Sequence, residues 1–206
     1  MYLAIDTSAG TSVAIVDAQG VVRAERDSAD TRKHAEVIGD FIHDCLAEAS
    51  IRVTDLTGVV AGMGPGPFTG LRVGIVAART FAFGASLPVL SVVTHDAIAL
   101  GETEPVIVAT DARRKEFYWS TYESTDDAGL PIRAAGPGLA PIAELASHVP
   151  NFERYSMRET ATVRAAQLAT LAQLMTASGR DFAGSEALYL RSPDVTPSAG
   201  PKRVTA

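Results

Sequence analysis

The stretch of residues 62–72, GMGPGPFTGLR, constrains the fold more than any other part of the chain. An apolar run that ends at residue 62 predicts a buried strand, and the run 71–83 predicts an apolar helix. A glycine-rich turn between a strand and a helix is typical of a phosphate cradle, because backbone N–H groups and the helix dipole attract anions. Here Pro65 and Pro67 remove two N–H donors, and no lysine follows the last glycine. The turn therefore predicts close packing of a helix on a sheet rather than phosphate binding.

Composition and charge narrow the class of protein. The 206 residues are 47% hydrophobic, which allows one or two domains with a real core. A net charge of −6 argues against direct nucleic-acid binding, which favours a basic patch, and the run Arg113-Arg114-Lys115 is too short to offset it. The single cysteine, Cys45, excludes an intramolecular disulfide. No signal-peptide pattern and no run of about 18 apolar residues is evident, so we expect a cytoplasmic protein without a membrane span.

The order of apolar runs predicts an internal duplication. Runs at 2–5, 12–16 and 21–25, separated by turn-rich segments, predict an antiparallel meander, followed by a helix at 34–49. Runs at 105–110, 116–122 and 130–134 repeat this plan, and further helices are expected at 141–147 and 162–177. Asp6 and Asp111 each end the first strand of a copy.

The duplication predicts an α/β protein of two lobes, each a mixed sheet flanked by helices, with the second lobe reduced. We expect a first lobe at 1–100 and a second at 101–191. Residues 192–206 hold three prolines and little apolar content, which indicates a mobile tail.

The turn Asp6-Thr7-Ser8 is similar to the phosphate-binding hairpin of actin-like ATPases and sugar kinases. The alternative is an Asx turn that caps a hairpin. The matching turn at 111–116 has no glycine and is filled with long charged side chains. One lobe thus resembles an ATPase and the other does not, which indicates a degenerate phosphate loop and no nucleotide cofactor.

The histidines and the cysteine give only weak signals for a metal site or a catalytic site. No two histidines have metal-ligand spacing, so we expect no metal site. His34 and His43 are expected to be solvated or to face a partner. His95 with Asp96 is either a base with its orienting carboxylate or part of a helix N-cap region. Cys45 lies in the apolar stripe of the first helix, which favours a buried inert thiol.

Two helices carry more apolar surface than one sheet face needs. In the helix after the glycine-rich turn, Gly70, Gly74 and Ala78 recur every four residues and form a smooth face. Larger apolar residues cover much of its remaining circumference, so the helix must be buried on most sides. Burial by a partner chain is one explanation, and coverage of the chain's own sheet is the other.

Several motifs together carry a family resemblance over nearly the whole chain. They are Leu3-Ala4-Ile5-Asp6-Thr7-Ser8, His34-Ala35-Glu36, the block 64–74, Asp111-Ala112-Arg113 with Glu116-Phe117-Tyr118-Trp119, and Tyr189-Leu190-Arg191. In this order they resemble the TsaB (YeaZ-type) family, and the block 64–74 is highly specific. The chain departs from the family at Pro67, where serine is frequent, and at Arg79, where lysine is common.

The resemblance implies a non-catalytic subunit of the bacterial machinery that makes threonylcarbamoyladenosine on tRNA. Such proteins have two actin-like lobes and pair through helices of the first lobe with a larger paralogue, TsaD, which holds the metal and transfers the threonylcarbamoyl group. A small P-loop ATPase, TsaE, joins the pair, and tRNA is expected to meet this subunit only indirectly. The residues implied in the partner interface are Val37, Ile38, Phe41, Ile42, Cys45, Leu46, Arg72, Val73, Val76 and Thr80.

Two alternatives stay open from the sequence. An active actin-fold enzyme, such as a small-molecule kinase or a metallopeptidase-like protein, would bind nucleotide or metal as an isolated chain. A homodimeric binding protein would use the same apolar helices for self-association. The interface hypothesis predicts that Phe41→Asp breaks the heterodimer and leaves the monomer folded.

Overall fold

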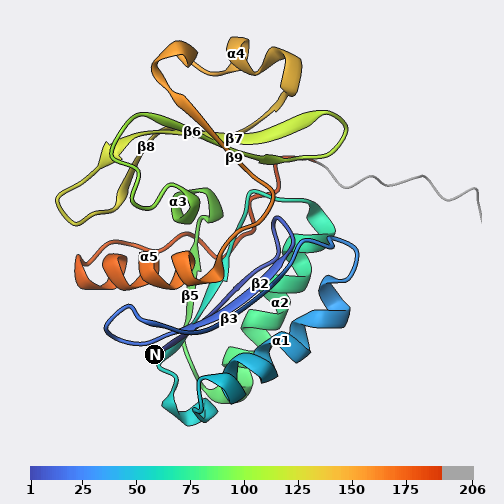
Figure 1. The fold of residues 1–206 in the computed structure, drawn as a ribbon, viewed down its shortest axis with the longest axis vertical. Coiled ribbons are helices and arrows are strands. Elements are labelled where there is room, and N and C mark those ends of the chain that lie inside the picture. Colours follow the sequence, from blue (N-terminus) through green and yellow to red (C-terminus); the bar gives the residue numbers. More distant parts are fainter. Residues whose placement is uncertain (192–206) are drawn as a thin grey trace, which may run out of the picture.

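The computed structural model describes residues 1–191 and contains two mixed β-sheets (Figure 1). The first sheet has the order β3-β2-β1-β4-β5. Its strands are β1 (Tyr2–Asp6), β2 (Thr11–Val16), β3 (Val22–Ser28), β4 (Gly58–Gly62) and β5 (Val89–Val92). The first three strands form the expected antiparallel meander, and β4 and β5 add parallel to β1.

The second sheet repeats this plan with the order β8-β7-β6-β9. Its strands are β6 (Val106–Asp111), β7 (Glu116–Thr125), β8 (Pro131–Pro141) and β9 (Ser156–Thr160). A meander again comes first, and β9 pairs parallel with β6 as β4 pairs with β1. The expected two-sheet α/β fold is confirmed. Sequence reasoning missed β5 and β9, because each is short and neither shows a clear alternation of apolar and polar residues.

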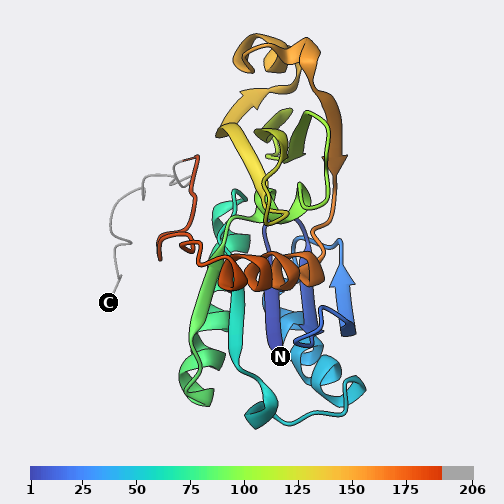
Figure 2. The ribbon, with the colours of Figure 1, turned by 90° about the vertical axis from the view of Figure 1, so that its left-hand side faces the viewer.

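Helices separate and cover the sheets. The helices are α1 (His34–Glu48), α2 (Phe68–Ala85), α3 (Thr94–Ile98), α4 (Leu145–His148) and α5 (Ala165–Ala177), with short 3-10 turns at Val53–Asp55, Ile142–Glu144 and Phe152–Arg154. In Figures 1 and 2, α1 and α2 lie side by side on one face of the first sheet, and α5 lies on the opposite face. The element α3 lies between the two sheets, and α4 covers the outer side of the second sheet.

Three apolar clusters follow from this layering. One packs the inner face of α1 and α2 against the first sheet, around Leu3, Ile5 and Leu71. A second fills the space between the sheets with α3 and α5, and includes Leu168. The third lies between the second sheet and α4, around Trp119. The first sheet is therefore buried on both faces, which agrees with the fully buried strands β2 and β4.

The chain returns to the first sheet after it has built the second. Helix α5 follows β9 in sequence, yet it packs on β1 and β2, across from α1 and α2. The segment after α5 then runs beside the first sheet, where the Ala183 N–H donates to the Ser91 carbonyl at 3.0 Å. Much of the range 165–191, which we expected in the second lobe, thus packs on the first sheet, while Arg180 and Arg191 pair with Asp126 and Glu116 of the second lobe.

The expected tail at 192–206 lies outside the described residues. Within residues 1–191, no helix combines the length and the apolar character that crossing a membrane requires.

Candidate functional sites: a packed turn between the lobes and an exposed helix pair

The phosphate-type turn after β1 is buried, and its carboxylate is fully engaged. The side chain of Asp6 accepts hydrogen bonds from the Ser8 backbone N–H at 2.7 Å and from the Ser8 hydroxyl at 2.5 Å. The Thr94 hydroxyl, at the start of α3, donates to the other carboxylate oxygen at 2.7 Å. Burial raises the pKa of Asp6, and these hydrogen bonds oppose the rise. The carboxylate therefore joins β1 to the segment that leads into the second lobe.

The glycine-rich loop packs directly on this turn. A Cβ at Gly62 would lie 1.9 Å from an Asp6 carboxylate oxygen, and one at Gly74 would lie 2.2 Å from the Thr7 hydroxyl oxygen. A Cβ at Gly66 would lie 2.7 Å from the Ser8 Cβ. These glycines leave room for the residues of the turn to pack directly on the backbone of β4, the loop and α2, as the sequence predicts for a packing turn. Helix α2 begins at Phe68, three residues before its expected start, because the Pro67 carbonyl already accepts the Leu71 N–H.

His34 is buried rather than solvated, so the expectation for this histidine is wrong. Its Nδ1 lies 2.8 Å from the Thr11 hydroxyl, and the start of α2 at Gly70 packs over its ring. Burial lowers the pKa of His34, and the negative charges of Asp6 and Asp30 oppose this shift. His43 is exposed, as expected, beside Asp44.

Three consecutive polar residues of α3 connect the two lobes. Thr94 bonds Asp6 of the first sheet, as described above. The buried His95 ring lies 2.8 Å from the Ser120 hydroxyl and 3.0 Å from the Thr110 hydroxyl, both on the second sheet. Burial lowers the pKa of His95 to about 3, so the ring is neutral. No side chain caps α3, whose N-cap residue is Val93, so this segment joins the lobes and is not a capping motif.

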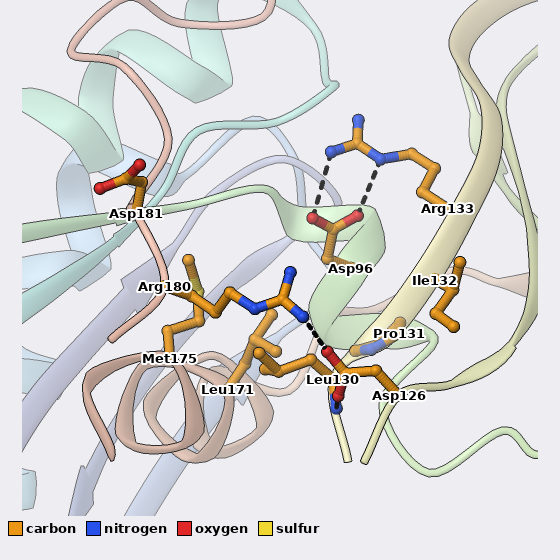
Figure 3. A pocket seen from close by; sticks show the side chains of 10 residues that line it. All are labelled: Asp96, Asp126, Leu130, Pro131, Ile132, Arg133, Leu171, Met175, Arg180 and Asp181. Carbon is orange, nitrogen blue, oxygen red and sulfur yellow. Dashed lines mark hydrogen bonds and ion pairs between the residues drawn. The ribbon is translucent and has the colours of Figure 1, made fainter. Parts of the chain in front are cut away.

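A pocket of about 640 Å³ opens beside α3, α5 and the β7–β8 hairpin (Figure 3). Asp96 accepts hydrogen bonds from the Tyr122 hydroxyl at 2.7 Å and from Arg133 at 3.2 Å, and Asp126 pairs with Arg180. The lining charges thus largely satisfy one another. The lining residues are Asp96, Asp126, Leu130, Pro131, Ile132, Arg133, Leu171, Met175, Arg180 and Asp181.

The helix pair α1 and α2 divides the expected interface residues into two sets. Cys45 is 0% exposed and Ile38 is 8% exposed, and both pack in the chain's own core. Neither can contact a partner in this fold, which corrects the expectation for these two residues. Their positions on α1 face the first sheet, where the Cys45 thiol donates to the Val13 carbonyl at 3.4 Å. Burial raises the pKa of this thiol to about 11, as expected for an inert cysteine.

The remaining candidates lie at the outer side of the helix pair. Val76 is 58% exposed and Phe83 is 88% exposed, which is unusual for two large apolar side chains on one helix. Arg72 and Thr80 are exposed, and the Arg72 guanidinium lies 5.1 Å from the centre of the Phe68 ring. We define the helix-pair surface by these exposed and half-buried residues: Val37, Phe41, Ile42, Leu46, Arg72, Val73, Val76, Thr80 and Phe83.

Phe83 is the member of this surface that the expected interface omitted. Its apolar character was visible in the sequence, but periodicity does not say which side of an apolar helix meets the sheet. In the described residues no group of three or more His, Cys, Asp or Glu side chains is arranged to hold a metal ion.

Two sheets built on one strand plan, with a phosphate-type turn between them, define an actin-like α/β protein with a reduced second lobe. A family model described as "TsaD: tRNA N6-adenosine threonylcarbamoyltransferase" matches residues 22–190. The chain belongs to this family, as a protein of the TsaB (YeaZ) type, which confirms the resemblance in its sequence motifs.

Individual relatives agree with this assignment. The chain is 35% identical to an uncharacterized protein of Mycobacterium tuberculosis over 209 residues, which cover 96% of this chain and 94% of that protein. It is 35% identical over 133 residues to the tRNA threonylcarbamoyladenosine biosynthesis protein TsaB of Escherichia coli, covering 62% of this chain and 57% of that protein. The solved structure of YeaZ from Pseudomonas aeruginosa matches with a TM-score of 0.74 and 26% identity, covering 92% of this chain and 99% of that chain.

Proposed function

We propose that this chain acts in the formation of threonylcarbamoyladenosine on tRNA, as a non-catalytic subunit that binds and activates a larger TsaD-type paralogue in the cytoplasm. A TsaE-type P-loop ATPase joins the pair. Family membership supports the pathway. The observation that carries the scaffold role is the helix-pair surface, on which Val76 and Phe83 expose their side chains to solvent.

An exposed apolar surface on adjacent helices favours docking of a second helical surface. Each buried square ångström of apolar area stabilises an interface by about 25 cal/mol before the costs of association. Val76 and Phe83 lie seven residues apart on α2, so their side chains project from the same side of the helix, two turns apart. Val37 and Phe41 on α1 are half-buried and add apolar residues to the helix-pair surface. The partner is therefore a protein that offers apolar helices of its own, and a second copy of this chain is the alternative occupant when the paralogue is absent.

The packed turn supports a role without catalysis. The Asp6 carboxylate is occupied by hydrogen bonds from Ser8 and Thr94, and the loop at Gly66 and helix α2 at Gly74 pack directly on the turn. The residues present do not fit a nucleotide phosphate or its metal here, because chain atoms already occupy the positions that such a ligand needs. The corresponding turn of the second lobe carries Arg113, without any glycine.

The test is a change on the exposed side of α2. We expect Val76→Asp to weaken binding to the TsaD-type paralogue about 100-fold, because a desolvated carboxylate would face an apolar partner. Isothermal titration calorimetry with the purified paralogue measures the dissociation constant. The matched control is Ile132→Asp, which alters a 44%-exposed apolar residue on β8 of the other lobe and leaves binding unchanged.

The thermal midpoint of both variants should stay close to that of the wild type, since neither side chain lies in an apolar cluster. Unchanged affinity of Val76→Asp for the paralogue would contradict the proposed interface. The earlier substitution Phe41→Asp remains a prediction, but Phe41 packs partly on the chain's own core, so Val76 separates binding from folding more cleanly.

A further inference from the structure

A cationic patch lies at the outer junction of the two lobes, on a protein whose net charge is −6. It combines the loop before α1, which carries Arg32 and Lys33, with the β6–β7 turn, which carries Arg113, Arg114 and Lys115. The two segments are about 80 residues apart in sequence, and a hydrogen bond from the Arg113 guanidinium to the Thr31 hydroxyl joins them.

The acidic neighbours of this patch are already paired. The Asp30 carboxylate forms an ion pair with the Arg32 guanidinium at 3.2 Å. The Asp111 carboxylate lies 3.9 Å from the guanidinium of Arg113. Glu116 pairs with Arg191, whose guanidinium also donates to the Ala112 carbonyl at 3.0 Å. Beyond these paired residues, the first turn of α1 adds one carboxylate, that of Glu36. Cations therefore outnumber carboxylates here, in contrast to the chain as a whole.

Two of the cations have no partner in the part of the chain that the structure describes. The ammonium groups of Lys33 and Lys115 form no hydrogen bond or ion pair with residues 1–191, and both side chains are exposed. These two groups are free to meet an anion from outside the protein without first breaking an internal pair.

The turn that presents these cations holds an uncommon backbone conformation. Arg113, Arg114 and Lys115 have φ values of 65°, 55° and 62°, so three consecutive residues with long side chains lie in the left-handed region. Non-glycine residues rarely adopt this region, because the side chain crowds the backbone there. The turn therefore carries arginine and lysine at three positions whose backbone conformation favours glycine. Backbone strain of this kind concentrates at functional positions.

We propose that this patch, defined by Arg32, Lys33, Arg113, Arg114 and Lys115, contacts the sugar-phosphate backbone of tRNA. The choice of RNA as the ligand rests on the proposed function in tRNA modification. The positive charge of the patch is complementary to the negative phosphates of RNA. Flexible lysines and exposed arginines suit phosphate contacts that position an RNA without reading its bases. The contact is direct, in contrast to the indirect role expected from the sequence.

The experiment measures binding of a fluorescently labelled, unmodified tRNA transcript to the full-length chain by anisotropy at several sodium chloride concentrations. The wild type binds with a salt-dependent dissociation constant. The double variant Lys33→Gln with Lys115→Gln raises that constant about tenfold at low salt, and lowers the slope of its logarithm against log salt by about 1 to 2.

The matched control removes two exposed cations from the opposite end of the first lobe. Arg23 lies at the start of β3 and Arg52 follows α1, whereas the patch lies at the end of β3 and the start of α1. Arg23→Gln with Arg52→Gln changes the net charge equally and leaves tRNA affinity within about twofold of the wild type, because contacts with phosphate act locally.

Three outcomes overturn the proposal: no salt-dependent tRNA binding by the wild type, equal weakening by the two double variants, or no change in Lys33→Gln with Lys115→Gln. Binding to the TsaD-type paralogue is measured on the same proteins. Loss of tRNA affinity with intact pairing isolates the patch, whereas Val76→Asp should lose pairing and keep tRNA affinity. Failure of the patch and failure of the scaffold role are therefore distinguished.

Discussion

The turns that follow the first strand of each meander occupy equivalent places in the two lobes but have opposite environments. The turn after β1 begins at Asp6, is buried, and is covered by the glycine-rich loop and α2. The turn after β6 begins at Asp111 and presents Arg113, Arg114 and Lys115 to solvent. Small residues let the chain pack onto the first turn, while long charged residues keep the second turn open.

This difference shows how a duplicated scaffold can separate its tasks. A turn covered by its own chain serves to hold the lobes together, through Asp6, Thr94 and then His95. An exposed turn can carry charged side chains, such as those of residues 113–115, without disturbing the packing of the lobe. Three substitutions, each with its own control or comparison, test this contrast.

The largest effect is expected where α2 meets the buried turn. Gly74→Ala should lower the free energy of unfolding by about 2–3 kcal/mol, because the added Cβ would lie 2.2 Å from the Thr7 hydroxyl oxygen. Gly84→Ala on the same helix is the control, since nothing lies within 4 Å of its Cβ and it should gain about 0.5–1 kcal/mol. Urea unfolding followed by circular dichroism measures both. Equal effects of the two substitutions would show that the turn is not tightly covered.

The second prediction concerns the pH dependence of the free energy of unfolding, which depends on His95 between the lobes. The folded-state pKa of His95 is about 3, below the ordinary value of 6.5, so the unfolded chain binds a proton that the folded chain excludes. Stability is therefore lost as pH falls from 6.5 toward 3. Between pH 6.5 and 5, the wild type should lose about 1.5 kcal/mol more than His95→Gln, which has no proton to take up.

Chemical denaturation of both proteins across this pH range measures the difference. Parallel stability profiles for wild type and variant would mean that His95 is not held neutral between the sheets. A steeper decline in the wild type supports α3 as a fixed connection between the lobes.

The smallest change in the free energy of unfolding is expected from a substitution in the exposed turn after β6. Lys115→Gly should raise the free energy of unfolding by roughly 1 kcal/mol or less, because glycine adopts a φ of 62° without steric cost. The unfolded chain gains freedom from the same change, which limits the benefit. The matched change Arg52→Gly, at a residue with a φ of −97°, should give no gain. A thermal midpoint that falls in Lys115→Gly would place the side chain in a stabilising contact and weaken the contrast between the turns.

Much of the local structure was predictable from the sequence. The apolar runs located the two meanders, and the positions of Asp6 and Asp111 indicated the duplication. The family motifs gave the correct assignment. The short strands β5 and β9 escaped prediction, because four or five residues without alternation carry too little periodic signal.

Most of the secondary-structure plan, the duplication and the glycines that permit close packing follow from the sequence, since these depend on neighbouring residues. The folded chain as a whole makes Ile38, Cys45 and His34 point inward while Val76 and Phe83 point outward. It also returns α5 to the first sheet and brings Arg113 to Thr31. Periodicity defines a helix face but not what covers it, because the cover comes from segments that are distant in the chain and meet only when the lobes assemble.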